Sequence, residues 1–141
     1  MGSVAGYLID TSALSRSMQA SVASVSEPLI RSGKVATCPP LDFEALYSAR
    51  NLHEYERVAS LRRTRFEYLA VEDREWQRAL EVQAALATRG RLRDVGMADL
   101  LIAAVAERHS LTLIHYDADF DTIADITGQD TRWVVPRGSV A

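Results

Sequence analysis

The sequence has one cysteine, one lysine and no long apolar run. Cys38 alone cannot form an internal disulfide, which suits a reducing compartment. No segment approaches the roughly 20 apolar residues of a membrane span, and the N-terminus lacks the basic and then apolar pattern of a secretory signal. The 141 residues are enough for one domain with its own core. These features predict a cytoplasmic protein that does not enter a membrane.

Lysine is almost absent, because Lys34 is the only lysine among 16 basic residues. Arginine binds phosphate and carboxylate through two parallel hydrogen bonds, although a GC-rich genome would produce the same bias. The net charge of −3 argues against passive coating of nucleic acid. A local basic rim around an acidic pocket is still compatible with that charge.

The stretch of residues 97–124 contains candidate metal-binding carboxylates and the elements that would place them. Residues 98–108 predict a helix that is apolar almost all round and therefore buried. Asp99 lies in its first turn, where the helix N-terminus favours an anion. Residues 111–114 (LTLI) predict a strand covered on both faces. Three acids follow that strand, where we expect a loop: Asp117, Asp119 and Asp121.

Strand and helix patterns alternate along the rest of the chain. Short apolar runs predict strands at residues 7–9, 35–38, 66–71 and 133–135. Apolar residues at helical spacing predict helices at residues 21–31, 41–51, 51–65 and 76–88. Such alternation is typical of an α/β fold with a central parallel sheet, here of about four to five strands flanked by helices. We expect one domain over residues 1–135 and a C-terminal tail at residues 136–141.

Helical periodicity also predicts which side chains face inward. In residues 41–51, Glu44 shares a stripe with Leu41 and Tyr47, so Glu44 points inward and Asp42 outward. The run at residues 62–65 (RRTR) is interpreted as a solvated face, with contact to RNA or a partner as the alternative. In residues 76–88 the apolar side is predicted from the residues Trp76, Leu80, Val82, Ala84 and Leu86.

Four acids distant in sequence are expected at one edge of the sheet. Ligands of parallel sheets bind beyond the carboxyl ends of the strands, and Asp10 and Asp117 each follow a strand there, while Glu44 and Asp99 lie near helix N-termini. Carboxylates this close repel one another unless a cation neutralises them. Oxygen ligands suit Mg²⁺ or Mn²⁺. The three histidines are scattered and lack zinc-site spacing, so we interpret them as structural: His53, His109 and His115.

The motifs YLIDTSAL, LDFEAL, MADLLIAAVA and LIHYDADFDTIA occur in this order over nearly the whole chain. Together they resemble the PIN domain, and specifically the VapC toxins of type II toxin–antitoxin systems. The resemblance implies a PIN-like three-layer sandwich and a Mg²⁺-dependent endoribonuclease that cleaves structured RNA, tRNA or rRNA, by metal-activated water. Where many relatives have Thr or Ser two residues before the fourth acid, this chain has His115, so a hydroxyl-dependent role there is in doubt.

Carried over by motif position, the resemblance implies a catalytic and metal-binding quartet of Asp10, Glu44, Asp99 and Asp117. Asp119 is a possible fifth metal ligand, and Thr11 or Ser12 would give polar support. We expect Asp10 and Asp99 to bind one ion directly, and Glu44 and Asp117 to bind a second ion or its waters. In the loop at residues 89–95 (RGRLRDV), the candidate RNA contacts are Arg89, Arg91 and Arg93.

The resemblance also implies partners, namely an inhibitory VapB-type antitoxin and a homodimer or toxin–antitoxin hetero-oligomer. The antitoxin would bind a groove lined by residues 21–31 and 41–65. A catalytically weak PIN module that binds RNA or protein remains an alternative. A Mg²⁺-dependent phosphatase is a less favoured alternative, because it would call for Asp-x-Asp after the first strand, where this chain has Asp10, Thr11 and Ser12. A receiver-like module would need paired acids after that strand and a lysine after the fifth, whereas one acid follows the strand and the only lysine is Lys34. A Ser/His hydrolase is improbable because no motif places a histidine beside Ser12.

Overall fold

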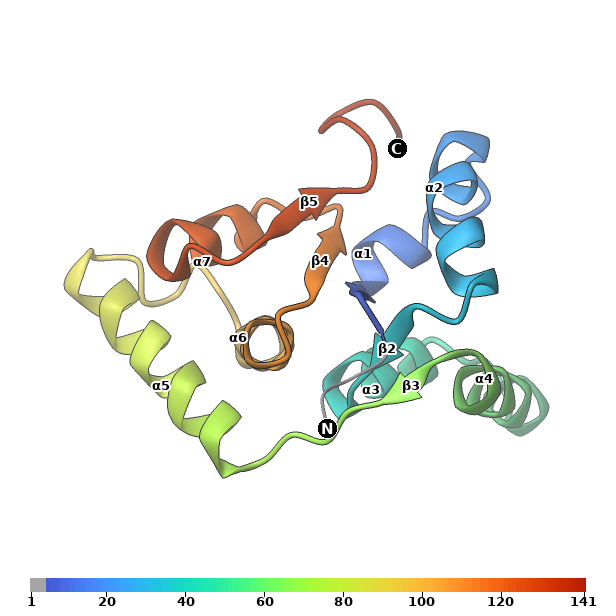
Figure 1. Cartoon of the computed structure of the whole chain (residues 1–141), viewed down its shortest axis with the longest axis horizontal. Coiled ribbons are helices and arrows are strands. Elements are labelled where there is room, and N and C mark those ends of the chain that lie inside the picture. Colours follow the sequence, from blue (N-terminus) through green and yellow to red (C-terminus); the bar gives the residue numbers. More distant parts are fainter. Residues whose placement is uncertain (1–4) are drawn as a thin grey trace.

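The structure is a computed structural model that describes residues 5–141. Five strands and seven helices are seen in these residues (Figure 1). The strands are β1 Tyr7–Ile9, β2 Val35–Thr37, β3 Glu67–Tyr68, β4 Thr112–His115 and β5 Thr131–Trp133. The helices are α1 Thr11–Leu14, α2 Ala20–Arg31, α3 Pro39–Tyr47, α4 Leu52–Arg65, α5 Asp73–Thr88, α6 Met97–Arg108 and α7 Asp119–Thr127.

The strands form one parallel sheet in the order β3-β2-β1-β4-β5. Tyr7 in β1 is in register with Val35 of β2 on one side and with Thr112 of β4 on the other. The predicted α/β fold with a parallel sheet is therefore confirmed. Strand β3 is shorter than predicted, and residues 119–127 form a helix, α7, where the sequence indicated only a loop.

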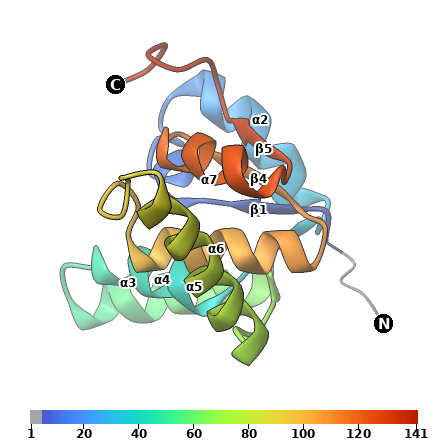
Figure 2. The same cartoon turned by 90° about the vertical axis from the view of Figure 1, so that its left-hand side faces the viewer.

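Helices cover both faces of the sheet, which makes three layers (Figure 2). One core joins the sheet to α3, α5, α6 and α7, and includes Leu8, Ile102 and Phe120. The second core lies under α1 and α2, and includes Ile9 and Val22. Successive residues of β1 thus enter opposite cores, as the alternation of side chains along a strand requires.

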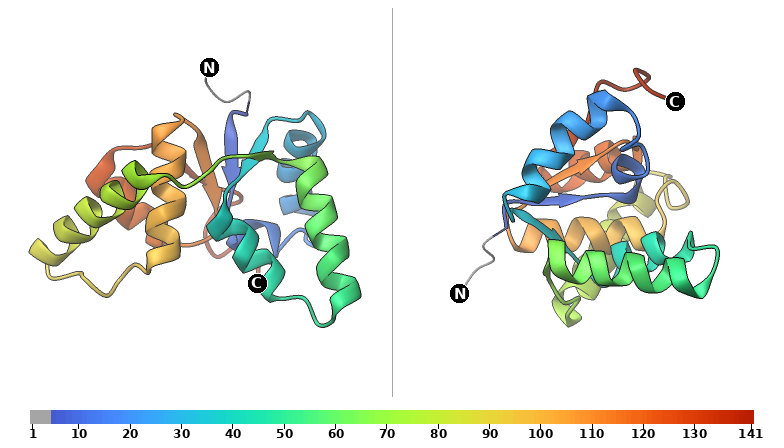
Figure 3. Two further views of the ribbon diagram at one scale, coloured as in Figure 1. Left: turned by 90° about the horizontal axis from the view of Figure 1, so that it is seen from below. Right: turned by 90° about the vertical axis from the view of Figure 1, so that its right-hand side faces the viewer.

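Helix α6 is the buried centre of its layer. Seven of its 12 residues are buried, in an unbroken run from Leu100 to Ala106. Figure 3 shows α5 and α6 side by side, with the α3 and α4 pair on the other side of the view. The prediction of a helix buried almost all round is confirmed.

Helix α5 turns a different face to the core than the sequence predicted. Its buried residues are Glu75, Ala79, Val82 and Leu86, whereas Trp76, Leu80 and Ala84 are exposed. The cause is an ion pair with another helix, since Arg108 Nη1 of α6 donates to Glu75 Oε1 at 2.7 Å. Arg108 stabilises the carboxylate of Glu75 in its buried position. The spacing of apolar residues within α5 gives no sign of this partner, because Arg108 belongs to another helix.

Helix α4 has 14 residues, none of them buried. It is attached through Arg62, whose side chain is only 11% exposed and donates from Nε to Asp42 Oδ1 at 2.8 Å. The same guanidinium donates from Nη2 to the Thr37 hydroxyl at 3.0 Å. Two predictions are therefore wrong: Asp42 faces α4 and not solvent, and Arg62 does not belong to a solvated run.

Residues 136–141 fold back against the domain. The Tyr116 hydroxyl donates to the carbonyl oxygen of Val140 at 2.9 Å and accepts from Gly138 N–H at 2.8 Å. Val140 packs against the core under α1 and α2. No helix within residues 5–141 has the length and hydropathy to cross a membrane.

Candidate metal centre

Acidic residues gather where strands β1 and β4 end. Asp10 directly follows β1, and Asp117 follows the neighbouring β4 by two residues. Asp119 is the first residue of α7, and Asp99 lies in the first turn of α6. Glu44 comes from α3, which contacts both α1 and α6. Four segments distant in the sequence thus contribute the five carboxylates of this edge, with Asp117 and Asp119 from the same segment.

Three of these acids form a close group. One carboxylate oxygen from each of Asp99, Asp117 and Asp119 lies within 4.8 Å of the other two. The turn that follows β4 is itself held by Asp117, because Asp117 Oδ1 accepts from Asp119 N–H at 2.9 Å. The sequence therefore brings two candidate ligands together locally, and the buried helix α6 brings the third.

Asp10 is the most deeply buried of the five, with 4% of its surface exposed. Its Oδ2 caps α1 by accepting from Ser12 N–H at 3.0 Å. Its Oδ1 is buried without a hydrogen-bond partner among the described residues. A buried carboxylate oxygen without a partner carries a large desolvation cost, so this atom is ready to accept a donor or a cation.

The charges show that the five acids share one site. Burial raises the pKa of Asp99 to about 7, and nearby negative charges add to the effect. In decreasing order of effect, these charges belong to Asp10, Asp117, Glu44 and Asp119. The charge of Asp10 therefore acts on Asp99, which is compatible with the predicted shared site.

Glu44 belongs to the same electrostatic environment. Burial and then the charge of Asp10 raise its pKa, while a hydrogen bond from the Thr11 hydroxyl to Oε1, 3.3 Å long, opposes the rise. Thr11 therefore supports the ionised form of Glu44. Asp119 has a raised pKa too, through burial and then the charge of Asp117, and the guanidinium of Arg91 acts in the opposite direction.

His115 holds the turn that presents Asp117. Its Nδ1 accepts from Asp117 N–H at 3.2 Å, and its ring packs against Phe120 and Trp133. Burial lowers the pKa of His115, which keeps the ring neutral and able to accept that bond. The hydroxyl that the resemblance led us to expect here is replaced by a ring nitrogen that supports the backbone.

Ser12 links the two turns that carry Asp10 and Asp117. Its hydroxyl oxygen accepts from Tyr116 N–H at 2.9 Å across the sheet edge. His115 Nδ1 is bonded to Asp117 N–H and thus is not a base for Ser12. The geometry gives Ser12 a structural role and offers no Ser/His pair.

The three candidate RNA-contacting arginines are exposed in the loop between α5 and α6. Arg91 Nε donates to Asp94 Oδ2 at 2.7 Å, and its Nη2 donates to the Thr122 hydroxyl at 3.2 Å. Arg91 therefore lies against the first turns of α7, beside Asp119. Arg89 and Arg93 are exposed on the same loop.

Asp121 is close in sequence to the acidic group but faces away from it. Both of its carboxylate oxygens accept from the indole N–H of Trp133, at 3.2 and 3.1 Å. The sequence did not indicate two further features of this edge, the contact between Tyr116 and residues 136–141 and the charge of Asp94 near Asp119. Both depend on tertiary contacts and leave no local signal.

The residues at this edge fit a divalent cation. All the candidate ligands are carboxylates, which suit hard cations such as Mg²⁺ and Mn²⁺. The unpartnered Asp10 Oδ1 and the raised pKa of Asp99 both show negative charge without sufficient compensation. A cation would remove that deficit.

Comparison with known proteins agrees with this architecture. The PIN domain family model matches residues 7–126, which include every acid of the centre. The chain therefore belongs to the PIN-domain family.

The more similar relatives within that family are VapC proteins. Ribonuclease VapC21 of Mycobacterium tuberculosis is 42% identical over 133 residues, covering 94% of this chain and 96% of the relative. Ribonuclease VapC51 of the same species is 42% identical over 134 residues, covering 95% and 96%. A solved structure of VapBC-5 from M. tuberculosis, a member of the VapBC family of toxin–antitoxin systems, has a TM-score of 0.62 and 26% identity. It covers 93% of this chain and 99% of that chain.

Proposed function

We propose that this protein is a metal-dependent endoribonuclease and the toxin of a VapBC-type toxin–antitoxin pair. The observation that carries the proposal is the carboxylate centre, with its buried and unpartnered Asp10 Oδ1, on a chain 42% identical to named VapC ribonucleases. The substrate class is structured RNA, tRNA or rRNA. The cation is Mg²⁺, with Mn²⁺ as an alternative of the same ligand preference.

Each acid has a distinct part in the proposed centre. Asp99, Asp117 and Asp119 supply the close oxygen group, and Asp10 supplies the unpartnered buried oxygen. Glu44, held by the Thr11 hydroxyl, completes the acidic wall. When bound, the cation supplies a water of lowered pKa and a counter-charge for the phosphodiester.

The chain itself positions the reactants and provides no activated side-chain nucleophile. Ser12 and His115 are both engaged with backbone N–H groups. In the proposed reaction the oxygen of water would form a bond to phosphorus while the P–O bond to a ribose oxygen breaks, and that ribose oxygen would leave with a proton. Asp99 must be ionised to serve as a ligand, so a pKa near 7 makes it sensitive to pH in the physiological range.

Cleavage of RNA tests the proposal. Labelled total RNA is incubated with the purified protein in Mg²⁺, with and without EDTA, beside Asp10→Asn and Asp99→Asn. We expect both variants to lose more than about 100-fold in rate, because losing even a residue that only supports a metal ligand costs 10–100-fold. Asp125→Asn, an exposed acid on α7, is the matched control and should cleave normally. Equal cleavage by all four proteins, or cleavage unaffected by EDTA, would contradict the proposal.

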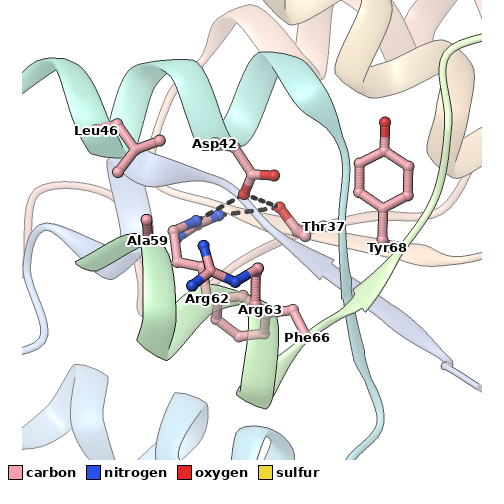
Figure 4. Close-up of a pocket in the computed structure, with 8 residues that line it drawn as sticks. All are labelled: Thr37, Asp42, Leu46, Ala59, Arg62, Arg63, Phe66 and Tyr68. Carbon is pink, nitrogen blue, oxygen red and sulfur yellow. Dashed lines mark hydrogen bonds and ion pairs between the residues drawn. The ribbon is translucent and has the colours of Figure 1, made fainter. Parts of the chain in front are cut away.

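The proposed antitoxin surface lies between α3, α4 and β3. A cavity of about 430 Å³ is lined there by Leu46, Phe66, Tyr68 and the arginines Arg62 and Arg63, among others (Figure 4). A second hollow of about 420 Å³ shares Asp42, Leu46 and Tyr68 with it. Its exposed aromatic residues are Phe43, Tyr47 and Tyr55. These hollows overlap the groove expected from the sequence, and exposed apolar surface of this kind marks partner binding.

We propose a VapB-type antitoxin segment as the occupant of this surface, in a homodimer or a toxin–antitoxin hetero-oligomer. Structures of VapBC complexes share the fold of this chain, which supports the proposal. A cytoplasmic location is proposed for the same pair.

Burial raises the pKa of the Cys38 thiol to about 12, so this cysteine stays protonated and chemically inert.

A further inference from the structure

Residues 136–141 are held in a defined conformation at the surface. The Tyr116 hydroxyl makes three hydrogen bonds to them: it donates to the Val140 carbonyl and accepts from the N–H groups of Gly138 and Val140, at 2.9, 2.8 and 3.3 Å. Arg16 Nε donates to the backbone oxygen of Ala141 at 3.0 Å. This C-terminal segment is therefore an ordered part of the surface.

The C-terminal segment is fastened to the two turns that carry Asp10 and Asp117. Tyr116 directly precedes Asp117, and its N–H donates to the Ser12 hydroxyl. Arg16 Nη1 donates to the Ser12 carbonyl at 2.6 Å. Figure 2 shows the C-terminus, the loop at residues 89–96 and the tip of β1 on the same side of the molecule. The segment is thus bonded to Tyr116, which adjoins Asp117 and is itself bonded to Ser12 in the turn after Asp10.

Arginine and aromatic side chains form a continuous stack under the C-terminal segment. The Arg16 guanidinium lies 4.5 Å from the Tyr116 ring centroid, and Tyr116 meets Trp133 edge-on at 5.3 Å. The Arg137 guanidinium lies 5.6 Å from the Trp133 ring centroid. Arg16 uses its N–H groups within the protein, whereas Arg137 is exposed and forms no ion pair within residues 5–141. Arg137 is therefore a positioned cation with unused donors.

Arg91 and Arg137 each adjoin a residue of α7 or a residue bonded to it. Arg91 bonds to Thr122 and lies near Asp119. Arg137 covers Trp133, whose indole N–H donates to Asp121. Both arginines are exposed and adjoin residues that lie in α7 or contact it, so both are available to an RNA strand bound at this end of α7.

We propose that the C-terminal segment forms a second RNA-contacting surface, in which Arg137 binds a backbone phosphate and Tyr116 and Trp133 hold it in position. The inference rests on the proposed ribonuclease function. A guanidinium stacked on an aromatic ring keeps its edge free for bidentate contact with a phosphate. Its conformation is restricted before binding, which lowers the entropy lost on contact.

RNA binding without cleavage tests the role of Arg137. In an Asp99→Asn background, the affinity for end-labelled total RNA is measured by filter binding over a range of salt concentrations. The loss of one phosphate contact lowers the slope of log K against log salt by about 0.7 to 0.9, which is about five- to eightfold in affinity at 0.1 M salt. We expect Arg137→Gln to show both changes. Arg31→Gln, an exposed arginine at the end of α2, is the control and should show neither.

Tyr116→Phe tests whether the hydrogen bonds of the Tyr116 hydroxyl to the C-terminal segment are needed for RNA binding. The variant keeps the backbone N–H to Ser12 and removes all three bonds to the C-terminal segment, so RNA affinity should fall to nearly the level of Arg137→Gln. Equal binding by Arg137→Gln and Arg31→Gln would overturn the inference, and normal binding by Tyr116→Phe would overturn the positioning role. If wild type still cleaves RNA in either case, the proposed function stands. If the Asp99→Asn protein binds no RNA and wild type cleaves none, both fail.

Discussion

Helices α6 and α4 are of similar length and differ in almost every other respect. Helix α6 buries seven of its 12 residues and carries Asp99 at its N-terminus. Helix α4 buries none of its 14 and is attached by one half-buried ion pair between Arg62 and Asp42. The helix that carries Asp99, a proposed metal ligand, is fixed by apolar packing, and the helix beside the proposed partner surface is attached by polar contacts. Regions with few buried contacts open at low free energy, which suits partner binding.

The largest effect on the free energy of unfolding should come from a substitution on the buried side of α6. Ile102→Ala removes a fully buried side chain and should lower the free energy of unfolding by about 2–5 kcal/mol. Leu61→Ala on α4, where the side chain is 38% exposed, should cost less than about 1 kcal/mol. Urea denaturation of both variants measures the contrast. Similar losses at the two positions would mean that α4 is packed as firmly as α6.

Loss of the ion pair that attaches α4 should have a smaller effect on stability, and the effect on hydrogen exchange should be confined to α4. Arg62→Ala removes bonds to Asp42 and Thr37 and should cost about 1–3 kcal/mol, the range for hydrogen bonds to charged groups. Hydrogen exchange should accelerate in α4 while α6 stays protected. The control is Arg63→Ala, an exposed neighbour in the same helix turn. Unchanged exchange in α4 would show that other contacts hold this helix.

The acidic end of α6 should make the metal-free protein sensitive to pH. The folded pKa of Asp99, about 7, lies above its ordinary value of 3.8, so this group stabilises the fold fully below 3.8 and loses that effect as pH rises through about 7. Asp99→Asn is neutral throughout and should therefore be more stable than wild type in EDTA at about pH 8, with a smaller difference at about pH 5. Thermal denaturation at both pH values measures this. A pH-independent difference would contradict the pKa.

The affinity for a cation should also depend on the ionisation of Asp99. Because a bound cation requires the ionised form of Asp99, the apparent affinity for Mg²⁺ should rise as pH increases through about 7. Calorimetric titration on each side of that pH measures the change. An affinity that does not vary with pH would show that Asp99 is not a ligand.

The smallest effect on stability should come from the exposed side of the α3 and α4 pair. Tyr47 is 93% exposed, so Tyr47→Ala should change the free energy of unfolding by less than about 0.5 kcal/mol. The same change should weaken complex formation with the antitoxin in a co-purification assay. Trp76→Ala, an exposed aromatic on α5, is the matched control. Normal complex formation by Tyr47→Ala would place the antitoxin elsewhere.

The elements with strong local patterns were predictable from the sequence. An unbroken apolar run indicated that α6 is buried, and the short runs before Asp10 and Asp117 indicated β1 and β4. Parallel strand order then placed those two acids at one edge. The assignment of individual ions to Asp10 with Asp99, and to Glu44 with Asp117, stays a prediction, and the observed close group is Asp99 with Asp117 and Asp119.

The features that sequence reasoning missed depend on partners distant in the chain. Glu75 is buried because Arg108 of another helix pairs with it, and Asp42 turns inward because Arg62 does so. Helix α7 escaped prediction because three acids in five residues are typical of a loop, although Phe120 and Ile123 pack its other face into the core. Periodicity within one segment does not contain such contacts.

The acids of the centre extend from Asp10 to Asp119, and β1 stands between β2 and β4 in the sheet. During translation, Asp10 and Glu44 are synthesised long before β4, the strand that pairs with the other side of β1 and precedes Asp117. A nascent chain therefore has no complete centre. The five carboxylates come together only after β4 has paired with β1.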